Sequence, residues 1–172
     1  MIIEPLIREN ICLNAHPTGC AVQVRSQVDY VKAQGDLPGP RRVLVLGASN
    51  GYGLASRLVS TFASGADTLG VAFERPAKGK RTASSGYYNT QAFEALARSE
   101  GRGAWSLNGD AFSREIKEQT IAAIQEHLTQ IDLLVYSIAA PRRQDPDTGE
   151  LYSSVIRPVA APYTAKTVDF LS

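Results

Sequence analysis

The sequence predicts an α/β fold in which helices flank a parallel sheet of the Rossmann type. Residues 43–46 form a short apolar run that stops at Gly47 and gives way to two more glycines and a helical pattern. Strand-like and helix-like segments then alternate as far as residue 137. The chain has 172 residues, enough for one domain with a buried core.

Composition narrows the classes of partner. Lys and Arg total 18 against 17 Asp and Glu, and a net charge of +1 favours neither nucleic acid nor an anionic membrane. No apolar run approaches the roughly 20 residues of a membrane span, and no signal-peptide core follows the first residues, so we expect a cytoplasmic protein. Cys12 and Cys20 match neither a CxxC redox pair nor a zinc site, so we expect reduced thiols and no metal.

We interpret the chain as a single, incomplete dinucleotide-binding domain. Residues 1–40 form a helical extension, residues 42–140 the nucleotide-binding core, and residues 141–172 a hairpin and an irregular tail. In the extension, apolar residues recur at helical spacing and Gly35 is a plausible stop. We expect His16, beside a turn, to act as a structural hydrogen-bonding group. The predicted buried face of this helix consists of Ala21, Val24, Val28 and Val31.

The loop from Gly47 to Gly53 has the spacing G-x-x-x-G-x-G. A glycine turn before a helix leaves backbone N–H groups unpaired at the positive helix end, and the missing Cβ atoms let a pyrophosphate approach. This spacing differs from the commonest dinucleotide fingerprint and resembles the variant used by short-chain dehydrogenase/reductase folds. We therefore predict dinucleotide binding. A glycine-rich connection that binds nothing is the alternative.

A second strand is predicted at residues 68–73, after a helix that ends near Gly65. The side chains of that helix expected to face the sheet are Leu54, Leu58, Val59 and Phe62. Glu74 follows the strand about 20 residues past the loop, where a carboxylate can accept hydrogen bonds from ribose hydroxyls. This favours NADH over NADPH. Arg75 leaves the alternative open, because its guanidinium could pair with a 2′-phosphate.

Residues 76–88 form a basic segment that contains glycine and serine. Its Lys78, Lys80 and Arg81 could bind a phosphate of the cofactor or substrate, but a solvent-exposed loop is the favoured interpretation. Thr90 is the expected N-cap of the next helix, which ends at Gly101. The apolar residues of that helix are Phe93, Leu96 and Ala97.

Residues 105–107 read as a third strand, and Asp110 behind it is placed to face an adenine amino group. Ser113 is the expected cap of the following helix. The residues of this helix predicted to point inward are Ile116, Ile121, Ile124 and Leu128.

Residues 131–137 are the most apolar strand, and their near-continuous hydrophobicity predicts burial on both faces of a parallel sheet. The predicted strand order is 3-2-1-4, in which this fourth strand is an edge and a possible surface for self-association. Behind it, the segment 138–141 (Ile-Ala-Ala-Pro) offers small residues where a nicotinamide ribose would pass. A turn at residues 145–150 then suggests a hairpin whose second strand spans residues 151–156.

Together these motifs resemble the trans-2-enoyl-CoA reductases, large bacterial relatives of short-chain dehydrogenases that also serve as enoyl-acyl-carrier-protein reductases. The resemblance implies NADH as hydride donor, an enoyl-CoA or enoyl-ACP substrate, and a role in fatty acid synthesis. The segments that carry it are residues 1–3, 16–20, 43–55, 65–71, 73–76, 108–113, 136–137 and 141–143. The implied cofactor contacts are Gly47, Ala48, Ser49, Asn50, Gly51, Tyr52, Phe73, Glu74, Asp110, Ala111, Ile138 and Ala139.

The sequence departs from that family in its catalytic pair. The family's enzymes are more than twice as long, and their Tyr-x8-Lys pattern occurs nowhere in these 172 residues. Tyr163 and Lys166 come nearest to the shorter Tyr-x3-Lys pattern, but are one residue too close, so no catalytic residue is predicted. Hydride addition to an enoyl thioester leaves an enolate that must be stabilised and protonated. We therefore expect a cofactor-binding portion that is inactive alone. The alternatives are a non-enzymatic NAD(H)-binding module and a degenerate truncated product.

Overall fold

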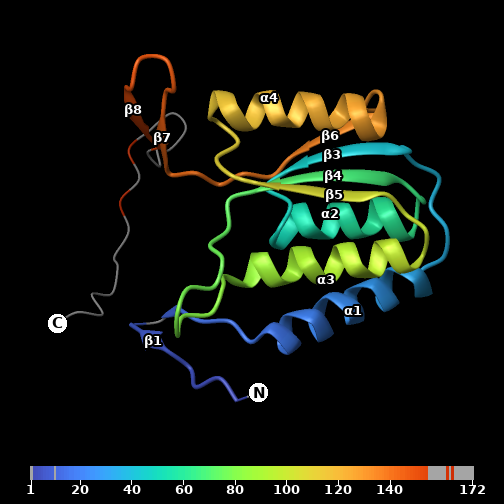
Figure 1. Ribbon diagram of the computed structural model, residues 1–172, viewed down its shortest axis with the longest axis horizontal. Coiled ribbons are helices and arrows are strands. Elements are labelled where there is room, and N and C mark those ends of the chain that lie inside the picture. The colour runs from blue at the N-terminus through green and yellow to red at the C-terminus, as the bar shows by residue number, and fades with distance from the viewer. Residues whose placement is uncertain (1, 10, 155–161, 163, 165–172) are drawn as a thin grey trace. The chain divides into compact units, whose positions relative to one another are not determined.

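The computed structural model describes residues 2–9, 11–154, 162 and 164. The chain separates into a larger unit, Met1–Ile138, and a smaller unit, Ala139–Ser172. The larger unit contains the sheet and its helices (Figure 1).

A parallel sheet forms the centre of the larger unit. Its strand order, β5-β4-β3-β6, confirms the predicted order 3-2-1-4. In register, Leu44 of the central strand pairs with Leu69 on one side and Leu134 on the other. The strands are β3 (Arg42–Leu46), β4 (Asp67–Ala72), β5 (Ala104–Asn108) and β6 (Leu133–Tyr136).

Helices cover both faces of this sheet (Figure 1). On one face lie α2 (Gly51–Phe62) and α3 (Ser85–Ser99), with α1 (Pro17–Ala33) packed outside them. On the other face lies α4 (Arg114–Ala123), which continues into the π-helical turn η1 (Ile124–Leu128).

Each face has its own hydrophobic core. The core on the α2 and α3 face joins α1 to the sheet through Val24, Val28, Leu54, Leu58, Phe93, Leu96, Ala97 and Ala104. The core beneath α4 and η1 consists of Leu44, Leu69, Val71, Ile116 and Leu128. The sheet is therefore a layer packed on both sides, as expected of parallel strands joined by helical crossovers.

Helix α1 begins four residues earlier than the apolar pattern suggested. His16 is its N-cap and accepts a hydrogen bond from the backbone N of Gly19 at 3.2 Å, which confirms its structural role. The buried line begins at Cys20, four residues before Val24, so Ala21 is exposed and its predicted burial was wrong. Gly35 lies just beyond the helix with φ +85°, as predicted.

Two other predicted inward-facing residues are exposed. Val59 of α2 lies beside Leu133 and Val135 of the edge strand, where the described residues provide no further cover. Ile121 of α4 is 56% exposed because the buried line runs from Ile116 to Thr120 at a spacing of four. Both corrections concern helix faces that periodicity assigns only approximately.

Helix α3 begins at Ser85 rather than after Thr90. Ser84 occupies the N-cap position, and the Thr90 hydroxyl instead donates to the Gly86 carbonyl one turn back, at 2.8 Å. The predicted core residues of this helix are buried, and Gly101 follows its end with φ +70°.

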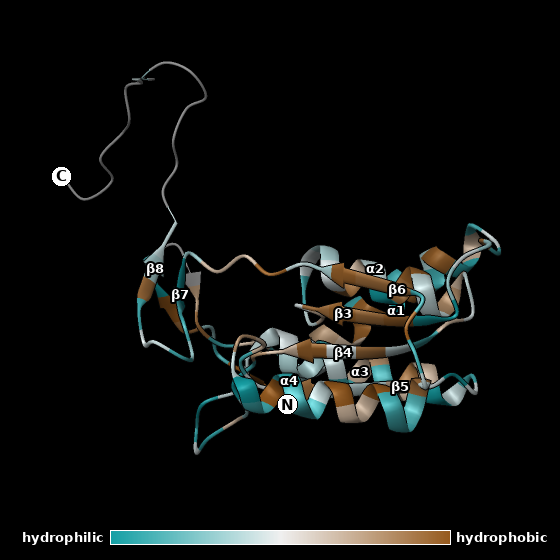
Figure 2. Ribbon diagram, turned by 90° about the horizontal axis from the view of Figure 1, so that it is seen from above, coloured by the Kyte–Doolittle hydropathy of each residue, from teal (hydrophilic) through white to brown (hydrophobic). Residues whose placement is uncertain are grey.

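Strand β6 confirms the predicted edge and corrects the predicted burial. Leu133, Leu134 and Tyr136 are 39%, 51% and 60% exposed, although the strand is as hydrophobic as its neighbours (Figure 2). In the described part of the chain no strand pairs with its outer side. An apolar strand is buried on both faces only where neighbours cover it.

Short antiparallel pairs lie near both ends of the chain. Near the N-terminus, β1 (Ile7–Arg8) pairs with β2 (Ile11–Cys12). In the smaller unit, β7 (Arg142–Gln144) pairs with β8 (Leu151–Ser153), which confirms the predicted hairpin. Residues 155–156 of the predicted strand, and the pair Tyr163 and Lys166, lie outside the described residues.

Two further observations concern the cysteines and the helices. Cys12 and Cys20 are both free thiols, as expected. Within the described ranges, no helix combines the length and the apolar character needed to cross a membrane.

Candidate functional site

The turn between β3 and α2 depends on glycines for room as well as for conformation. Gly47 has φ +85°, and a Cβ at this position would overlap the carbonyl oxygen of Ser137. A Cβ at Gly53 would overlap the carbonyl oxygen of Gly47. Ile138 also approaches Gly47, so the segment leaving β6 packs directly against the loop. The glycine spacing therefore lets two chain segments meet at the carboxyl end of the sheet.

The backbone N–H groups at the beginning of this turn are paired, whereas the prediction concerned those at the helix end. The N–H groups of Gly47 and Ala48 both donate to the carbonyl of Val71, at 2.8 and 3.1 Å. The first N–H groups of a helix have no acceptor within it. Asn50, the N-cap of α2, makes no side-chain cap hydrogen bond to them. The groups suited to an anion are therefore those of residues 51–53, not those of the first glycine.

The carboxylate of Glu74 lies against the loop and against the start of α3. Its Oε1 accepts hydrogen bonds from the Ser49 hydroxyl at 2.5 Å and from the Asn50 side-chain amide at 3.4 Å. Its Oε2 accepts a short hydrogen bond from the Ser84 hydroxyl. The structure thus brings together three predicted site residues, Ser49, Asn50 and Glu74, and adds Ser84 to them.

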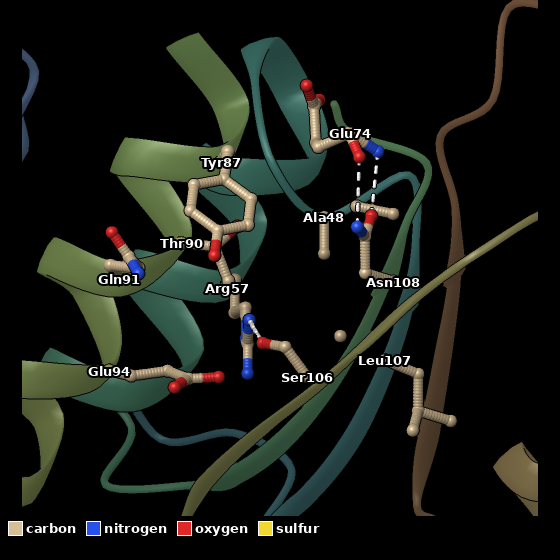
Figure 3. A pocket seen from close by; sticks show the side chains of 12 residues that line it. Ala48, Arg57, Glu74, Tyr87, Thr90, Gln91, Glu94, Ser106, Leu107 and Asn108 are labelled. Carbon is tan, nitrogen blue, oxygen red and sulfur yellow. Dashed lines mark hydrogen bonds between the residues drawn. The ribbon is translucent and has the colours of Figure 1, made fainter. Parts of the chain in front are cut away.

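Two asparagines that sequence reasoning did not single out hold this arrangement in place. Asn108 makes a two-way amide pair with the backbone of Glu74, at 2.7 and 2.9 Å (Figure 3). Asn89 of α3 donates to the Ser49 carbonyl at 3.2 Å and to the Asn50 side chain at 2.9 Å. Asn108 could have been found from its position directly after the strand predicted at residues 105–107. Asn89 could not, because its contacts with Ser49 and Asn50 form only when α3 packs back against the loop.

Arg57 is a buried cation beneath the site. Its side chain is 1% exposed and donates to the Ser106 hydroxyl at 2.8 Å, to the Thr68 hydroxyl at 3.1 Å, and to the carbonyls of Thr68 and Trp105. The guanidinium carbon lies 4.3 Å from the centre of the Phe93 ring. Burial lowers the pKa of Arg57 to about 9, and the negative charge of Glu94 opposes that shift. The group stays charged at neutral pH and joins α2 to β4 and β5.

A cavity of about 250 Å³ opens beside these residues, between α3 and the carboxyl halves of β4 and β5. Figure 3 shows Tyr87 and Glu94 of α3 on one side and Ser106 and Asn108 of β5 on the other. The cavity has room because β4 contributes only Gly70 and Ala72 to its wall. A Cβ at Gly70 would crowd Arg57. Of the predicted contacts, Ala48 and Glu74 border the cavity.

In the described part of the chain, the Glu74 carboxylate makes no hydrogen bond with the predicted site residues Tyr52, Phe73, Asp110, Ala111 or Ala139. Phe73 and Tyr52 are 78% and 88% exposed, so both present an open aromatic surface. Asp110 is exposed and accepts a hydrogen bond from the Phe112 backbone N at 2.9 Å, within its own turn. Ala111 follows it and is half-buried. Ala139 is exposed and begins the smaller unit.

Two family models match consecutive parts of the chain. Residues 2–79 match the NAD(P)H binding domain of trans-2-enoyl-CoA reductase. Residues 81–172 match the trans-2-enoyl-CoA reductase catalytic region. The division falls between β4 and α3, so the four-stranded parallel sheet contains strands from both matched regions.

Curated relatives are similar over almost the whole chain. An NADH enoyl-[acyl-carrier-protein] reductase of Pseudoalteromonas atlantica is 55% identical over 170 residues, covering 98% of this chain and 43% of the relative. An NADH trans-2-enoyl-CoA reductase of Clostridium perfringens is 53% identical over 170 residues, covering 99% of this chain and 44% of the relative. The chain therefore spans less than half the length of the curated relatives it matches.

Solved structures agree with this similarity. Trans-2-enoyl-CoA reductase of Clostridium acetobutulicum in complex with NADH matches with a TM-score of 0.86 and 39% identity, covering 94% of this chain and 41% of that chain. The enzyme of Treponema denticola in complex with NAD matches with a TM-score of 0.87 and 46% identity, covering 98% and 44%.

Proposed function

Because the chain belongs to the trans-2-enoyl-CoA reductase family, we propose that it forms the NADH-binding portion of an enzyme that reduces the carbon–carbon double bond of trans-2-enoyl thioesters. The observation that carries this proposal is the match of both family models, end to end, over residues 2–79 and 81–172. Glu74 supports NADH in particular, because a carboxylate at the end of β4 accepts hydrogen bonds from ribose hydroxyls and repels a 2′-phosphate.

We assign the cofactor to the carboxyl end of the sheet within residues 42–140. The first-turn N–H groups of α2 would face the pyrophosphate, and Glu74 the adenosine ribose. Asp110 would approach the adenine, and Ile138 and Ala139 the nicotinamide ribose. The proposed contacts are Gly47, Ala48, Ser49, Asn50, Gly51, Tyr52, Phe73, Glu74, Asp110, Ala111, Ile138 and Ala139.

The reaction has two chemical requirements. Bound NADH would supply a hydride to the β-carbon of the enoyl thioester, and the enolate left behind needs a hydrogen-bond donor at its oxygen and a proton. The described site residues hold and orient the cofactor. The sequence has no Tyr-x8-Lys pattern for the second requirement, so we expect no reduction of crotonyl-CoA by this chain alone.

The thioester carrier is coenzyme A or acyl carrier protein. Relatives of almost equal identity are named for each: the Pseudoalteromonas atlantica protein for the acyl carrier protein and the Clostridium perfringens protein for coenzyme A. We propose a place in fatty acid synthesis, where enoyl thioesters are reduced.

Titration of the chain with NADH tests the proposal. We expect saturable enhancement of nicotinamide fluorescence, and none with a Gly47→Val variant, whose side chain would overlap Ser137. Absence of NADH binding by a folded wild-type chain would overturn the proposal.

A complementation assay tests the assigned reaction. Adding the separately expressed remainder of the Treponema denticola relative should restore crotonyl-CoA reduction, which neither part shows alone. Strong NADH oxidation by this chain alone that survives Tyr163→Phe would contradict the proposed division of labour.

We also propose that the exposed outer side of β6 supports self-association. A strand edge presents unpaired backbone N–H and C=O groups to a second strand. Leu37, Pro38, Tyr52 and Val59 line an apolar groove next to Leu133 and Val135, which would add buried apolar surface to such pairing.

A further inference from the structure

The Glu74 carboxylate is held by side chains from the starts of two helices. Asn50 precedes α2 and Ser84 precedes α3, and both donate to Glu74. Ser49, which is 6% exposed, supplies the third donor. A carboxylate with hydrogen bonds to both oxygens has little freedom to rotate. In the described residues, Glu74 therefore has a fixed position at the carboxyl end of β4.

Ser84 makes this contact in place of the one its position predicts. A serine at an N-cap normally accepts a hydrogen bond from a backbone N–H of the first helical turn. Ser113 does so at the start of α4, where it accepts from the Ile116 N–H at 3.2 Å. Ser84 makes no cap hydrogen bond. Its hydroxyl donates to Glu74 in a short hydrogen bond, with the Arg75 carbonyl as a second acceptor at 3.3 Å, while its oxygen accepts from the Arg75 N–H at 3.0 Å. Ser84 thus binds both Glu74 and Arg75, which follow β4.

The helix start also leaves room for the carboxylate. Gly86 is buried in the first turn of α3, and a Cβ there would overlap Glu74 Oε1. Its φ lies outside the left-handed region, so the backbone conformation does not require glycine. The requirement is space, because the first turn of α3 packs directly against the charged group of Glu74.

From these contacts we infer that Ser84 is a positioning residue that fixes the Glu74 carboxylate and thereby makes the dinucleotide site select a ribose 2′-hydroxyl over a 2′-phosphate. This inference rests on the proposed function. A carboxylate offers about four acceptor positions, and the described residues occupy three, which leaves one for a ribose hydroxyl. A fixed carboxylate also repels a phosphate dianion, whereas an untethered glutamate can rotate toward water and expose the phosphate to Arg75.

Matched variants of the 172-residue chain test this role. Dissociation constants for NADH and NADPH are measured by fluorescence titration for the wild type, Ser84→Ala, Ser84→Thr and Ser85→Ala. The wild type should bind NADH about tenfold or more tightly than NADPH. Ser84→Ala should reduce this preference about fivefold, mainly by tighter NADPH binding. Ser84→Thr keeps the hydroxyl and should restore the preference. Ser85 is exposed one residue further on, so Ser85→Ala should behave as the wild type.

A second variant reaches the same carboxylate without removing the hydroxyl. Gly86→Ala should displace Glu74 and lower the preference at least as much as Ser84→Ala, in a chain whose circular dichroism shows native helix content. A wild-type chain that binds neither nucleotide overturns the proposed function. A wild-type chain that prefers NADH, with Ser84→Ala and Gly86→Ala variants that keep the same preference, overturns the role of Ser84 alone.

Discussion

Leu69 and Leu134 occupy equivalent places on the two sides of the central strand. Both pair with Leu44, one from β4 and one from β6. Leu69 is 1% exposed and Leu134 is 51% exposed. Residue type and register are the same, so the difference comes from what lies beyond each strand. β4 has β5 on its outer side, whereas β6 has no further strand in the described part of the chain. Hydrophobicity thus marks a strand for burial, and its neighbours decide whether burial is achieved.

The largest expected effect tests this comparison directly. Leu69→Ala should lower the free energy of unfolding by about 3 kcal/mol, because it opens a cavity in a packed core. Leu134→Ala should lower it by about 1 kcal/mol or less, since half of its side chain already contacts solvent. Urea denaturation of both variants measures the difference. Equal losses would show that the two sides of β3 are packed alike.

A second pair of variants probes the glycine loop, where β4 and the chain after β6 both contact the turn that follows β3. Gly47 donates its N–H to Val71 of β4 and lies against Ser137 behind β6. Gly47→Ala should cost about 2–3 kcal/mol, from left-handed backbone strain together with overlap. Gly51→Ala shares the positive φ, at +52°, but its Cβ would meet open space, so about 1 kcal/mol is expected. Denaturation midpoints of the two variants separate collision from strain. A larger loss for Gly51→Ala would contradict the packing of residue 137 on the loop.

A charged residue on the exposed edge strand β6 should change self-association of the chain more than its free energy of unfolding. Leu134→Lys should weaken self-association about tenfold, because a lysine on an edge strand opposes pairing with a second strand. Ile121→Lys provides the control, since Ile121 is 56% exposed on α4, away from the edge. Sedimentation velocity over a range of concentrations measures both. If the two variants associate equally, or the wild type is monomeric throughout, β6 is not the contact.

Much of this architecture could be predicted from local pattern. The apolar run before Gly47 and the acidic residue after the second strand identified the loop and Glu74, because both signals lie within one βαβ unit. The start of α3 was misplaced because Thr90 and Ser84 are both acceptable caps, and local chemistry does not choose between them. The contacts of Asn89 and Asn108 depend on crossover packing and strand register, which become visible only in the folded chain.

The smallest expected effect concerns how β6 is held to β3. Asp132, just before β6, accepts hydrogen bonds from the backbone N of Arg41 at 3.1 Å and of Arg42 at 3.0 Å, and from the Arg42 guanidinium at 2.8 Å. The Arg42 side chain is the main cause of a lowered Asp132 pKa. A carboxyl whose pKa is lower in the folded state stabilises the fold above its unfolded pKa of about 4, and this contribution disappears as pH falls through the folded value.

The stability of wild type and Asp132→Asn should therefore differ at pH 7 and converge as the pH falls below about 4. Asp145→Asn is the matched control, because backbone N–H groups of Asp147 and Thr148 lower the pKa of Asp145 within the smaller unit. Its substitution should leave unfolding of the larger unit unchanged. Urea titrations from pH 7 to pH 3 measure both variants. A wild-type advantage over Asp132→Asn that does not vary with pH would mean that the charge of Asp132 contributes nothing to the stability of the fold.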